Sequence, residues 1–322
     1  MKNAYKVIIA VIVTLGLLLI IGELIIRVYL YHSIIYDIEM TKYAMSVKTD
    51  SSNLLIGHVH KPNTSAQLMG VNVSINSDGL RDREYPVSKK EKYRIIVLGD
   101  SLTFGWGVEE EDTFVSILEQ KINKLYPAEI INFGAGNYNT EQEVNLFIEK
   151  GLKYKPDKVV VFYFINDAEL TPKKSKLWFL GYSQLISFYW SRINILINKY
   201  FPDQSFKDYY SNLYEKNQKG WLNAQKSFLR LKNIYHQNGI RLQVVLLPEL
   251  HDVDNKIFNN EYSKVSAFLE SAGIDYLNLA TLFTGYDNPI SLWVAMDDAH
   301  PNALAHRMIA DNSFEFIVNK KN

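Results

Sequence analysis

Hydrophobic and polar positions change their spacing several times along this chain, and each spacing predicts a different element. Residues 7–26 are apolar or small at every position except Thr14 and Glu23. A helix crosses a bilayer with about 20 such residues, so this segment predicts a membrane-spanning helix. Lys2 and Lys6 precede it. Basic residues ahead of a span favour a cytoplasmic N-terminus, so we expect the chain after about residue 31 to lie outside the cytoplasm.

A cleaved signal peptide is the alternative interpretation of this N-terminal segment. No small-x-small cleavage site follows the apolar core, and residues 23–27 continue the helical pattern. We therefore expect an uncleaved membrane anchor over residues 1–31. A stalk with a short β extension is predicted over residues 32–92, where residues 58–76 alternate in part between apolar and polar side chains.

Short apolar runs without helical spacing predict the strands of the remaining chain, residues 93–322. Parallel strands that are buried on both faces have this composition. Helical segments separate the runs, so the order of elements predicts an α/β fold with right-handed crossovers and one cleft at the carboxyl edge of a parallel sheet. The runs are at residues 95–98, 130–132, 158–164, 241–247 and 274–279, and the helices are predicted at 112–125, 141–150, 261–272 and 303–318.

Residues 171–238 exceed what a connection between two strands needs, so we interpret them as a helical insertion. Its first part, from Trp178 to Leu196, is dense in aromatic and aliphatic residues, and Pro202 interrupts the pattern before a second helical stretch at 207–236. The insertion could cover the cleft, lie against a membrane or form a packed helical pair. The sequence leaves these three alternatives open.

Composition and charge narrow the function only a little. The chain has 322 residues, of which 47% are hydrophobic and 22% charged, as is ordinary for a globular protein. Lys plus Arg and Asp plus Glu both number 35, so no basic excess points to nucleic acid. Cysteine is absent, which excludes disulfides and thiol catalysis without identifying the compartment.

Candidate chemistry begins directly after the first predicted strand of the sheet. Gly99 ends the apolar run, and Asp100 and Ser101 follow where the chain turns toward a helix. Open α/β folds place their chemistry at such strand-to-helix turns. A serine there presents its hydroxyl near backbone N–H groups that favour developing negative charge. Ser is also a common capping residue, so Ser101 alone does not establish catalysis.

Four blocks in order make the chain similar to the SGNH/GDSL hydrolase family from about Tyr93 to the C-terminus. They are Gly99-Asp100-Ser101-Leu102, the turn from Asn132 to Thr140, the segment Asn166-Asp167, and Asp297 with His300. The resemblance implies a flavodoxin-like three-layer α/β/α sandwich with a central parallel sheet. It also implies a serine ester hydrolase that needs no cofactor and no metal.

A catalytic triad follows from this resemblance. Serine is a poor nucleophile unless a base takes its proton, and histidine is the usual base. We predict Ser101 as nucleophile, His300 as general base and then acid, and Asp297 as the carboxylate that orients the imidazole. Asp298 fits the family less well, because the family's aspartate stands three residues before its histidine.

The family's oxyanion hole implies three hydrogen-bond donors. They are the Ser101 backbone N–H, a backbone N–H of the second-block turn, from Gly136 or Asn137, and the Asn166 side-chain amide. Two residues depart from the family pattern. Asn137 stands where the family has glycine, although Asn tolerates the left-handed conformation. Phe164 also replaces a glycine, which fills space beside the hole.

Two pairs of residues ahead of these blocks have other interpretations. His58 and His60 would share one side of a strand, and no further ligand completes a metal site, so we expect them at the surface. Arg81 and Arg83 could reach an anionic substrate, but ion pairing with Asp82 or a neighbouring glutamate is favoured.

The sequence hypothesis is therefore a membrane-anchored, extracytoplasmic serine esterase of SGNH type. Its location favours O-acetyl groups of cell-envelope or exported polysaccharide as substrate, with other esters open. The same triad could transfer the acyl group to a sugar hydroxyl, which would make the protein an O-acyltransferase. A non-catalytic glycan-binding or assembly protein is the third alternative. The expected partners are the membrane and the acylated substrate, without nucleic acid, and the sequence leaves the oligomeric state open.

Overall fold

The computed structural model describes residues 2–31, 34–171, 181–200 and 205–319. The chain forms two compact units: residues 1–45 with 174–203, and residues 46–173 with 204–322. The second unit contains all four predicted sequence blocks, and we call it the hydrolase unit. We predicted domain boundaries along the sequence, after residues 31 and 92. The two units are instead defined by contacts in space, so the predicted boundaries stay predictions.

A five-stranded parallel sheet forms the centre of the hydrolase unit, as the apolar runs predicted. Its strand order is β6-β5-β7-β8-β9, the flavodoxin-like order in which the first strand of the sheet lies between the second and third. Every neighbouring pair is parallel. The strands are β5 (Tyr93–Gly99), β6 (Ala128–Asn132), β7 (Lys158–Tyr163), β8 (Arg241–Leu246) and β9 (Asp275–Asn278).

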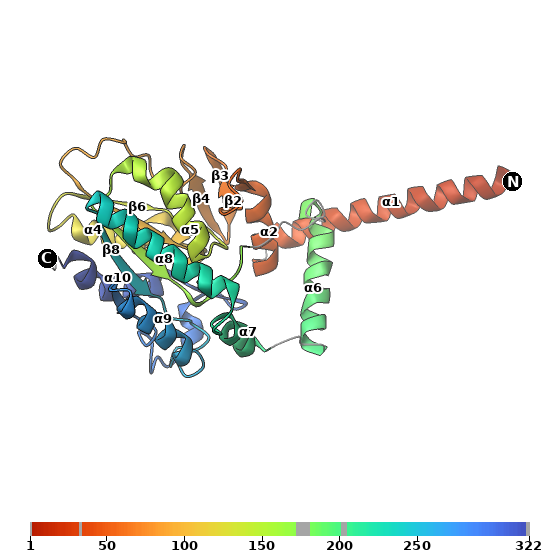
Figure 1. Cartoon of the computed structure of the whole chain (residues 1–322). Coiled ribbons are helices and arrows are strands. Elements are labelled where there is room, and N and C mark those ends of the chain that lie inside the picture. The colour runs from red at the N-terminus through yellow and green to blue at the C-terminus, as the bar shows by residue number, and fades with distance from the viewer. Residues whose placement is uncertain (1, 32–33, 172–180, 201–204, 320–322) are drawn as a thin grey trace. The chain divides into compact units, whose positions relative to one another are not determined.

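Helices cover both faces of this sheet and complete the predicted three-layer sandwich (Figure 1). Within β5, Ile96 and Leu98 pack into one hydrophobic core, whereas Ile95 and Val97 pack into the other, because successive strand residues point to opposite faces. One core is closed by α4 (Phe114–Ile122) and α10 (Ala303–Val318), and the other by α5 (Thr140–Leu146), α8 (Lys219–Asn238) and α9 (Asn259–Ser271).

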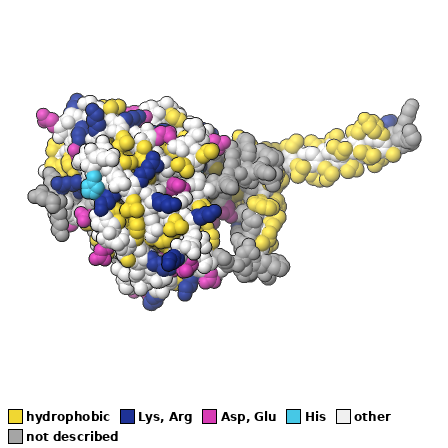
Figure 2. All heavy atoms as spheres, in the orientation of Figure 1, with side chains coloured by type: hydrophobic (Ala, Val, Ile, Leu, Met, Phe, Trp, Pro, Cys, Tyr) yellow, Lys and Arg dark blue, Asp and Glu magenta, His cyan; other side chains and the backbone are white. Residues whose placement is uncertain are grey.

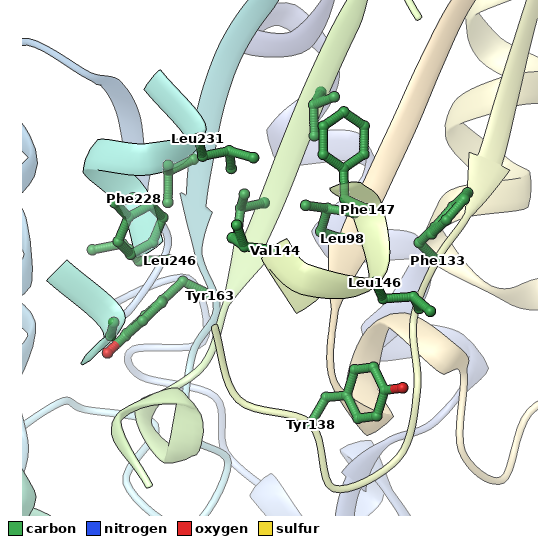
Figure 3. Packing of buried hydrophobic residues seen from close by; sticks show 14 of the residues in the cluster. Leu98, Phe133, Tyr138, Val144, Leu146, Phe147, Tyr163, Phe228, Leu231 and Leu246 are labelled. Atoms are coloured by element: carbon green, nitrogen blue, oxygen red, sulfur yellow. The ribbon is translucent and has the colours of Figure 1, made fainter. Parts of the chain in front are cut away.

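The core between the sheet and helices α5 and α8 supports the central strands, including β5, which leads into the serine turn. Figure 3 shows Val144 and Phe147, at the C-terminal half of α5 and just after it, packed over Leu98, while Phe228 and Leu231 of α8 pack near Leu246. These side chains are essentially inaccessible to solvent. Burial of each such side chain contributes about 1.5–3 kcal/mol, so this face of the sheet is firmly held.

Two helices have other boundaries than the sequence predicted, one because of a capping side chain and one because the helix changes its winding. The helix predicted over 112–125 begins later, because the Thr113 hydroxyl accepts a hydrogen bond from the Ser116 N–H at 3.2 Å and caps α4. A separate 3₁₀ turn, Glu110–Asp112, precedes that cap. The helix predicted over 141–150 widens into a π turn at Phe147–Gly151 and ends in a 3₁₀ turn at Leu152–Tyr154.

Two antiparallel hairpins form the β extension that the alternation predicted before the sheet. The first pairs β1 (Lys48–Asp50) with β2 (His58–His60), and the second pairs β3 (Thr64–Leu68) with β4 (Val71–Ile75). In the predicted insertion, α7 (Phe206–Leu213) belongs to the hydrolase unit, as does α8.

The first unit contains the long N-terminal helix α1 (Lys2–Tyr31), helix α2 (Tyr36–Ser46) and helix α6 (Gln184–Tyr200). By length and composition, α1 can cross a membrane from Ala4 to Leu30, and no residue of its most apolar window is buried. The aromatic residues predicted to start the insertion at 178–180 lie outside the described residues, as does Pro202.

Candidate active site

Ser101 lies where β5 ends and the one-turn helix α3 (Ser101–Phe104) begins. The Asp100 carboxylate caps this helix by accepting a hydrogen bond from the Leu102 N–H at 2.9 Å. Gly105 ends the helix in the left-handed conformation, with φ 83°, where a Cβ atom would lie 2.4 Å from Thr113. The turn therefore needs glycine there, and it holds Ser101 at the carboxyl edge of the sheet with 8% of its surface exposed.

His300 reaches Ser101 from a two-stranded hairpin near the C-terminus. The hairpin pairs β10 (Trp293–Ala295) with β11 (Asp298–Pro301), and it follows a 3₁₀ turn at Pro289–Leu292. The Ser101 Oγ lies 2.8 Å from the His300 Nε2, a hydrogen-bonding distance between residues that are 199 positions apart. The structure thus brings together the two side chains that the sequence predicted to meet.

The acid that holds this histidine is Asp298, which corrects the prediction of Asp297. The Asp298 Oδ1 lies 2.5 Å from the His300 Nδ1 and also accepts a hydrogen bond from the His300 backbone N–H at 3.1 Å. The prediction assumed a turn, in which residues three apart meet. Residues 298–301 instead form a strand, where side chains two apart point to the same face. Asp297 lies in the two-residue hairpin turn and is exposed.

Trp106 completes the surroundings of Asp298, and the sequence analysis missed it. Its indole Nε1–H donates to the second carboxylate oxygen of Asp298 at 2.8 Å, and its ring lies 6.2 Å from that of His300. Burial acts to raise the pKa of Asp298, but the hydrogen bond and charge of His300, with the Trp106 indole, outweigh it and lower that pKa. Asp298 therefore stays ionised and can stabilise an imidazolium.

Asn166 approaches the serine turn from a third strand end. It lies in the 3₁₀ turn Ile165–Ala168 directly after β7, and its side chain hydrogen-bonds the Asp100 carboxylate. A side-chain amide carries two N–H donors, so a contact with Asp100 fixes the direction of the other donor. Its place beside Ser101 is compatible with the predicted role in the oxyanion hole, which stays a prediction.

The second-block turn packs closely against the serine turn. A Cβ atom on Gly134 would lie 2.3 Å from the Phe104 backbone nitrogen, so only glycine allows this approach. Asn137 adopts the left-handed conformation with φ 64°, as expected for an Asn at a glycine-like position. Whether Gly136 or Asn137 supplies the backbone donor stays a prediction.

Residues of the first hairpin hold this second turn from outside, a feature the sequence did not reveal. The Lys48 Nζ donates to the Gly136 carbonyl at 2.9 Å and to the Asn137 side-chain oxygen at 2.8 Å. The His58 Nε2 also lies 3.0 Å from the Gly136 carbonyl. Burial lowers the pKa of Lys48 to about 7.

The predicted surface position is wrong for His60, and His58 is half-buried rather than exposed. His60 is buried, with its Nδ1 3.1 Å from the Gly79 carbonyl, and His58 packs against the Tyr138 ring. Burial, with the nearby charge of Lys48, lowers the pKa of each histidine to about 3, so both rings are neutral at pH 7.

The main contacts of the two arginine side chains are with other partners than the acids favoured from sequence. Arg81 is fully buried and donates to the carbonyls of Phe104, Gly105 and Val108, so its guanidinium braces the chain after α3. Arg83 pairs with Glu119 through two hydrogen bonds of 2.6 Å.

Three buried carboxyl groups lie close together behind the serine turn. Glu143 of α5 has both side-chain oxygens buried without a hydrogen-bond partner among the described residues. Burial and the charge of Asp100 raise the pKa of Glu143, and burial with the charges of Glu143 and Asp100 raises that of Asp167. Like charges at this depth disfavour the ionised form of Glu143, so the folded chain holds this proton more tightly than the unfolded chain does.

Replacing Glu143 by glutamine is therefore expected to remove an alkaline loss of stability. The unfolded chain releases this proton near pH 4.3, whereas the folded chain retains it to higher pH. Folding consequently loses stability as pH rises between the two values, by at most about 1.4 kcal/mol per pH unit for one proton.

In urea melts, the free energy of unfolding of Glu143→Gln should match that of the unaltered protein below pH 4 and exceed it at pH 8. The control Glu141→Gln changes a carboxyl on the same helix that is not fully buried. Equal pH slopes for Glu143→Gln and the unaltered protein would contradict the account.

Comparison with known proteins assigns the chain to a family. The model of the GDSL-like lipase/acylhydrolase family matches residues 97–308, which is well over half of the chain. The chain belongs to this family. The matched residues include Ser101, His300 and both candidate acids, so this GDSL-like acylhydrolase is a serine ester hydrolase. No curated protein sequence is significantly similar to it.

Solved structures resemble the GDSL-like acylhydrolase at low sequence identity. An acetyl xylan esterase is 15% identical and is matched over 70% of this chain and 100% of its own, with a TM-score of 0.45. A catalytic mutant of an acetylxylan esterase from Geobacillus stearothermophilus is 12% identical over 72% and 98% of the two chains, with a TM-score of 0.47. A lipase/acylhydrolase from Enterococcus faecalis is 14% identical over 70% and 95%, with a TM-score of 0.43. Similarity of this degree carries no information on the substrate.

Proposed function

We propose that this GDSL-like acylhydrolase is a membrane-anchored, extracytoplasmic esterase that removes O-acetyl groups from cell-envelope or exported polysaccharide. The observation that supports its chemistry is the chain of contacts from Ser101 through His300 to Asp298. Its location is supported by the exposed apolar helix α1 with lysines ahead of it. The substrate class is the ester that such a location offers to a serine hydrolase.

In the proposed mechanism, the His300 Nε2 takes the Ser101 hydroxyl proton while the Ser101 Oγ attacks the ester carbonyl carbon. The imidazolium is stabilised by Asp298, which accepts the Nδ1–H, and Trp106 holds the other oxygen of that carboxylate. His300 then returns the proton to the sugar oxygen as the C–O bond breaks, leaving an acetyl-enzyme. His300 then deprotonates a water that attacks the acetyl carbonyl carbon, and it returns this proton to the Ser101 Oγ as the bond to that oxygen breaks and acetate leaves.

Negative charge that develops on the carbonyl oxygen needs donors at the rim of the site. We assign them to the Ser101 backbone N–H, a backbone N–H of Gly136 or Asn137, and the Asn166 side-chain amide. Each donor of this kind contributes about 10²–10³ in rate. The contact between Asn166 and Asp100 and the contacts of Lys48 on the second turn would preset two of these donors before substrate binds.

Acetate release from an acetylated polysaccharide by the full-length protein in detergent tests the substrate class, with Ser101→Ala as control. We expect acetate from acetylated xylan, and faster turnover of p-nitrophenyl acetate than of p-nitrophenyl palmitate. Acetyl groups that appear on an added glycan acceptor in place of free acetate would assign an O-acyltransferase. Absence of turnover and of fluorophosphonate labelling would assign a binding protein.

The extracytoplasmic location is tested separately, because the chain has no cysteine of its own. Leu125→Cys places one thiol on an exposed position of the hydrolase unit. A maleimide that does not cross membranes should label it in intact cells. Labelling only after the cells are lysed would contradict this location.

A further inference from the structure

Helix α6 carries an apolar stripe that nothing in its own unit covers among the described residues. Between 42% and 61% of each side chain in this stripe is exposed, whereas large apolar side chains of a folded unit are normally buried. Their spacing of three and four residues puts them on one side of the helix. The stripe consists of Ile186, Tyr189, Trp190, Ile193, Leu196 and Ile197. Figure 2 shows the apolar surface of α1 continuing onto α6.

The other side of α6 packs within its unit. The Ser191 hydroxyl donates to the Asp37 carboxylate of α2, and the Phe188 ring lies edge-on to Tyr29 of α1 at 6.1 Å. Leu185 packs over Gly22 of α1. The exposed stripe is therefore not the side of α6 that binds its neighbours.

Glu23 fixes the point on α1 at which α6 begins. Its carboxylate accepts hydrogen bonds from the Gln184 N–H at 3.0 Å and the Leu185 N–H at 2.9 Å, and from the Ser183 hydroxyl at 2.8 Å. These two N–H groups lie at the start of α6, where backbone N–H groups have no hydrogen-bond partner within the helix, so Glu23 caps the helix. From this point α6 runs across the axis of α1 rather than beside it (Figure 1).

The length of α1 before Glu23 matches one bilayer. From Val7 to Gly22 the helix rises roughly 24 Å at 1.5 Å per residue, and Tyr5 and Lys6 just before it have the composition of the opposite interface of a hydrocarbon core about 30 Å thick. If α1 spans the membrane, Glu23 and the start of α6 therefore lie at its outer boundary. A helix there with an apolar stripe that includes Tyr and Trp has the composition of an interfacial helix.

We propose that α6 lies in the outer interface of the same bilayer that α1 spans, with its stripe immersed among the upper acyl chains. The inference rests on the membrane anchoring proposed above. Residues on both sides of α6 in the chain belong to the hydrolase unit, so α6 gives that unit a second attachment to the membrane besides α1. Of the three alternatives for the start of the insertion, this selects contact with the membrane.

Single cysteines measure the depth of α6 in full-length protein reconstituted into phosphatidylcholine vesicles. The variants Ile193→Cys and Leu196→Cys place an environment-sensitive fluorophore on the stripe, and Ser187→Cys places it off the stripe on the same helix. Val13→Cys, ten residues or about 15 Å before Glu23 on α1, marks the bilayer core, and Leu125→Cys on the hydrolase unit marks water. Spin-labelled lipids with the quencher high or low on the acyl chain report the depth.

We expect the labels on residues 193 and 196 to be quenched most by the high quencher, about 5–10 Å inside the headgroup boundary. The label on Val13→Cys should be quenched most by the low quencher, and that on Ser187→Cys less than the stripe labels. Stripe labels as weakly quenched as Leu125→Cys, beside a quenched Val13→Cys, would overturn the proposal for α6 and leave the anchor. Equal quenching on and off the stripe, or stripe labels as deep as Val13→Cys, would also overturn it. An unquenched Val13→Cys would refute the anchor itself.

Discussion

Replacing Ser101 by alanine is expected to lower kcat for p-nitrophenyl acetate by about 10⁴- to 10⁶-fold. The Ser101 Oγ is the atom that lies 2.8 Å from the His300 Nε2, and alanine leaves the imidazole with no nucleophile to activate. The side chain is small and caps no other group, so the melting temperature should stay close to that of the unaltered protein. Initial rates and thermal melts of the two proteins measure both effects.

Ser263→Ala is the matched control for this loss, because Ser263 is an exposed serine of α9 in the same unit. It should retain full activity. If Ser101→Ala kept more than a small fraction of the activity, the ester would be cleaved without the acyl-enzyme that the proposed mechanism requires.

The pair Asp298→Asn and Asp297→Asn is expected to separate two adjacent carboxylates by their function. Asparagine at residue 298 keeps the shape but favours the wrong tautomer of His300, a change that lowers kcat by about 10⁴-fold in serine enzymes. Asparagine at residue 297 changes an exposed position in the hairpin turn, where a substitution usually alters stability by less than about 0.5 kcal/mol. We therefore expect Asp297→Asn to keep most of its activity. Comparison of kcat at pH 7 measures both effects.

The opposite order of these two variants would show that the family spacing of three residues operates in this chain. Trp106→Phe provides an additional check, because it removes the hydrogen bond to the second oxygen of Asp298 and keeps an aromatic ring at this position. Its effect should be in the same direction as that of Asp298→Asn and smaller.

The architecture of the sheet could be predicted from sequence because four of its strands, all except the edge strand β9, are short apolar runs that are mostly buried. Residues 95–98 show this most clearly, because all four are buried and they alternate between the two cores. The meeting of Ser101 with His300 followed from the order of the sequence blocks, since parallel strands end at one edge. Both inferences use only the composition and the order of short sequence segments, so they need no knowledge of which distant residues contact each other.

The acid of the site could not be predicted, because it depends on a local conformation that the sequence leaves open. In the segment Met296-Asp297-Asp298-Ala299-His300, a turn would bring residues three apart together and a strand those two apart. Pairing of residue 295 with residue 298 decides for the strand, and this pairing is a property of the hairpin. The alternation of the strand then selects Asp298.

Residues that brace the site were missed for a related reason. Arg81 donates to three backbone carbonyls, and Lys48 donates to one backbone carbonyl and to the Asn137 side-chain oxygen, all in segments distant in sequence. Every residue has a backbone carbonyl, so such contacts cannot be recognised from the residue types. Charged neighbours in sequence therefore suggested ion pairs, although Arg81 contributes through three carbonyls instead. Trp106 was also missed because of sequence distance, since its partner Asp298 lies 192 positions away.

Mass spectrometry of a fluorophosphonate adduct tests the activated serine most directly. A fluorophosphonate reacts with a serine hydroxyl whose proton is taken by a neighbouring base, and the phosphonyl group stays on that oxygen. We predict one adduct per chain, located on the peptide that contains Ser101, and lost in both Ser101→Ala and His300→Ala. An unlabelled protein, or an adduct that persists on another residue in these variants, would contradict the assignment.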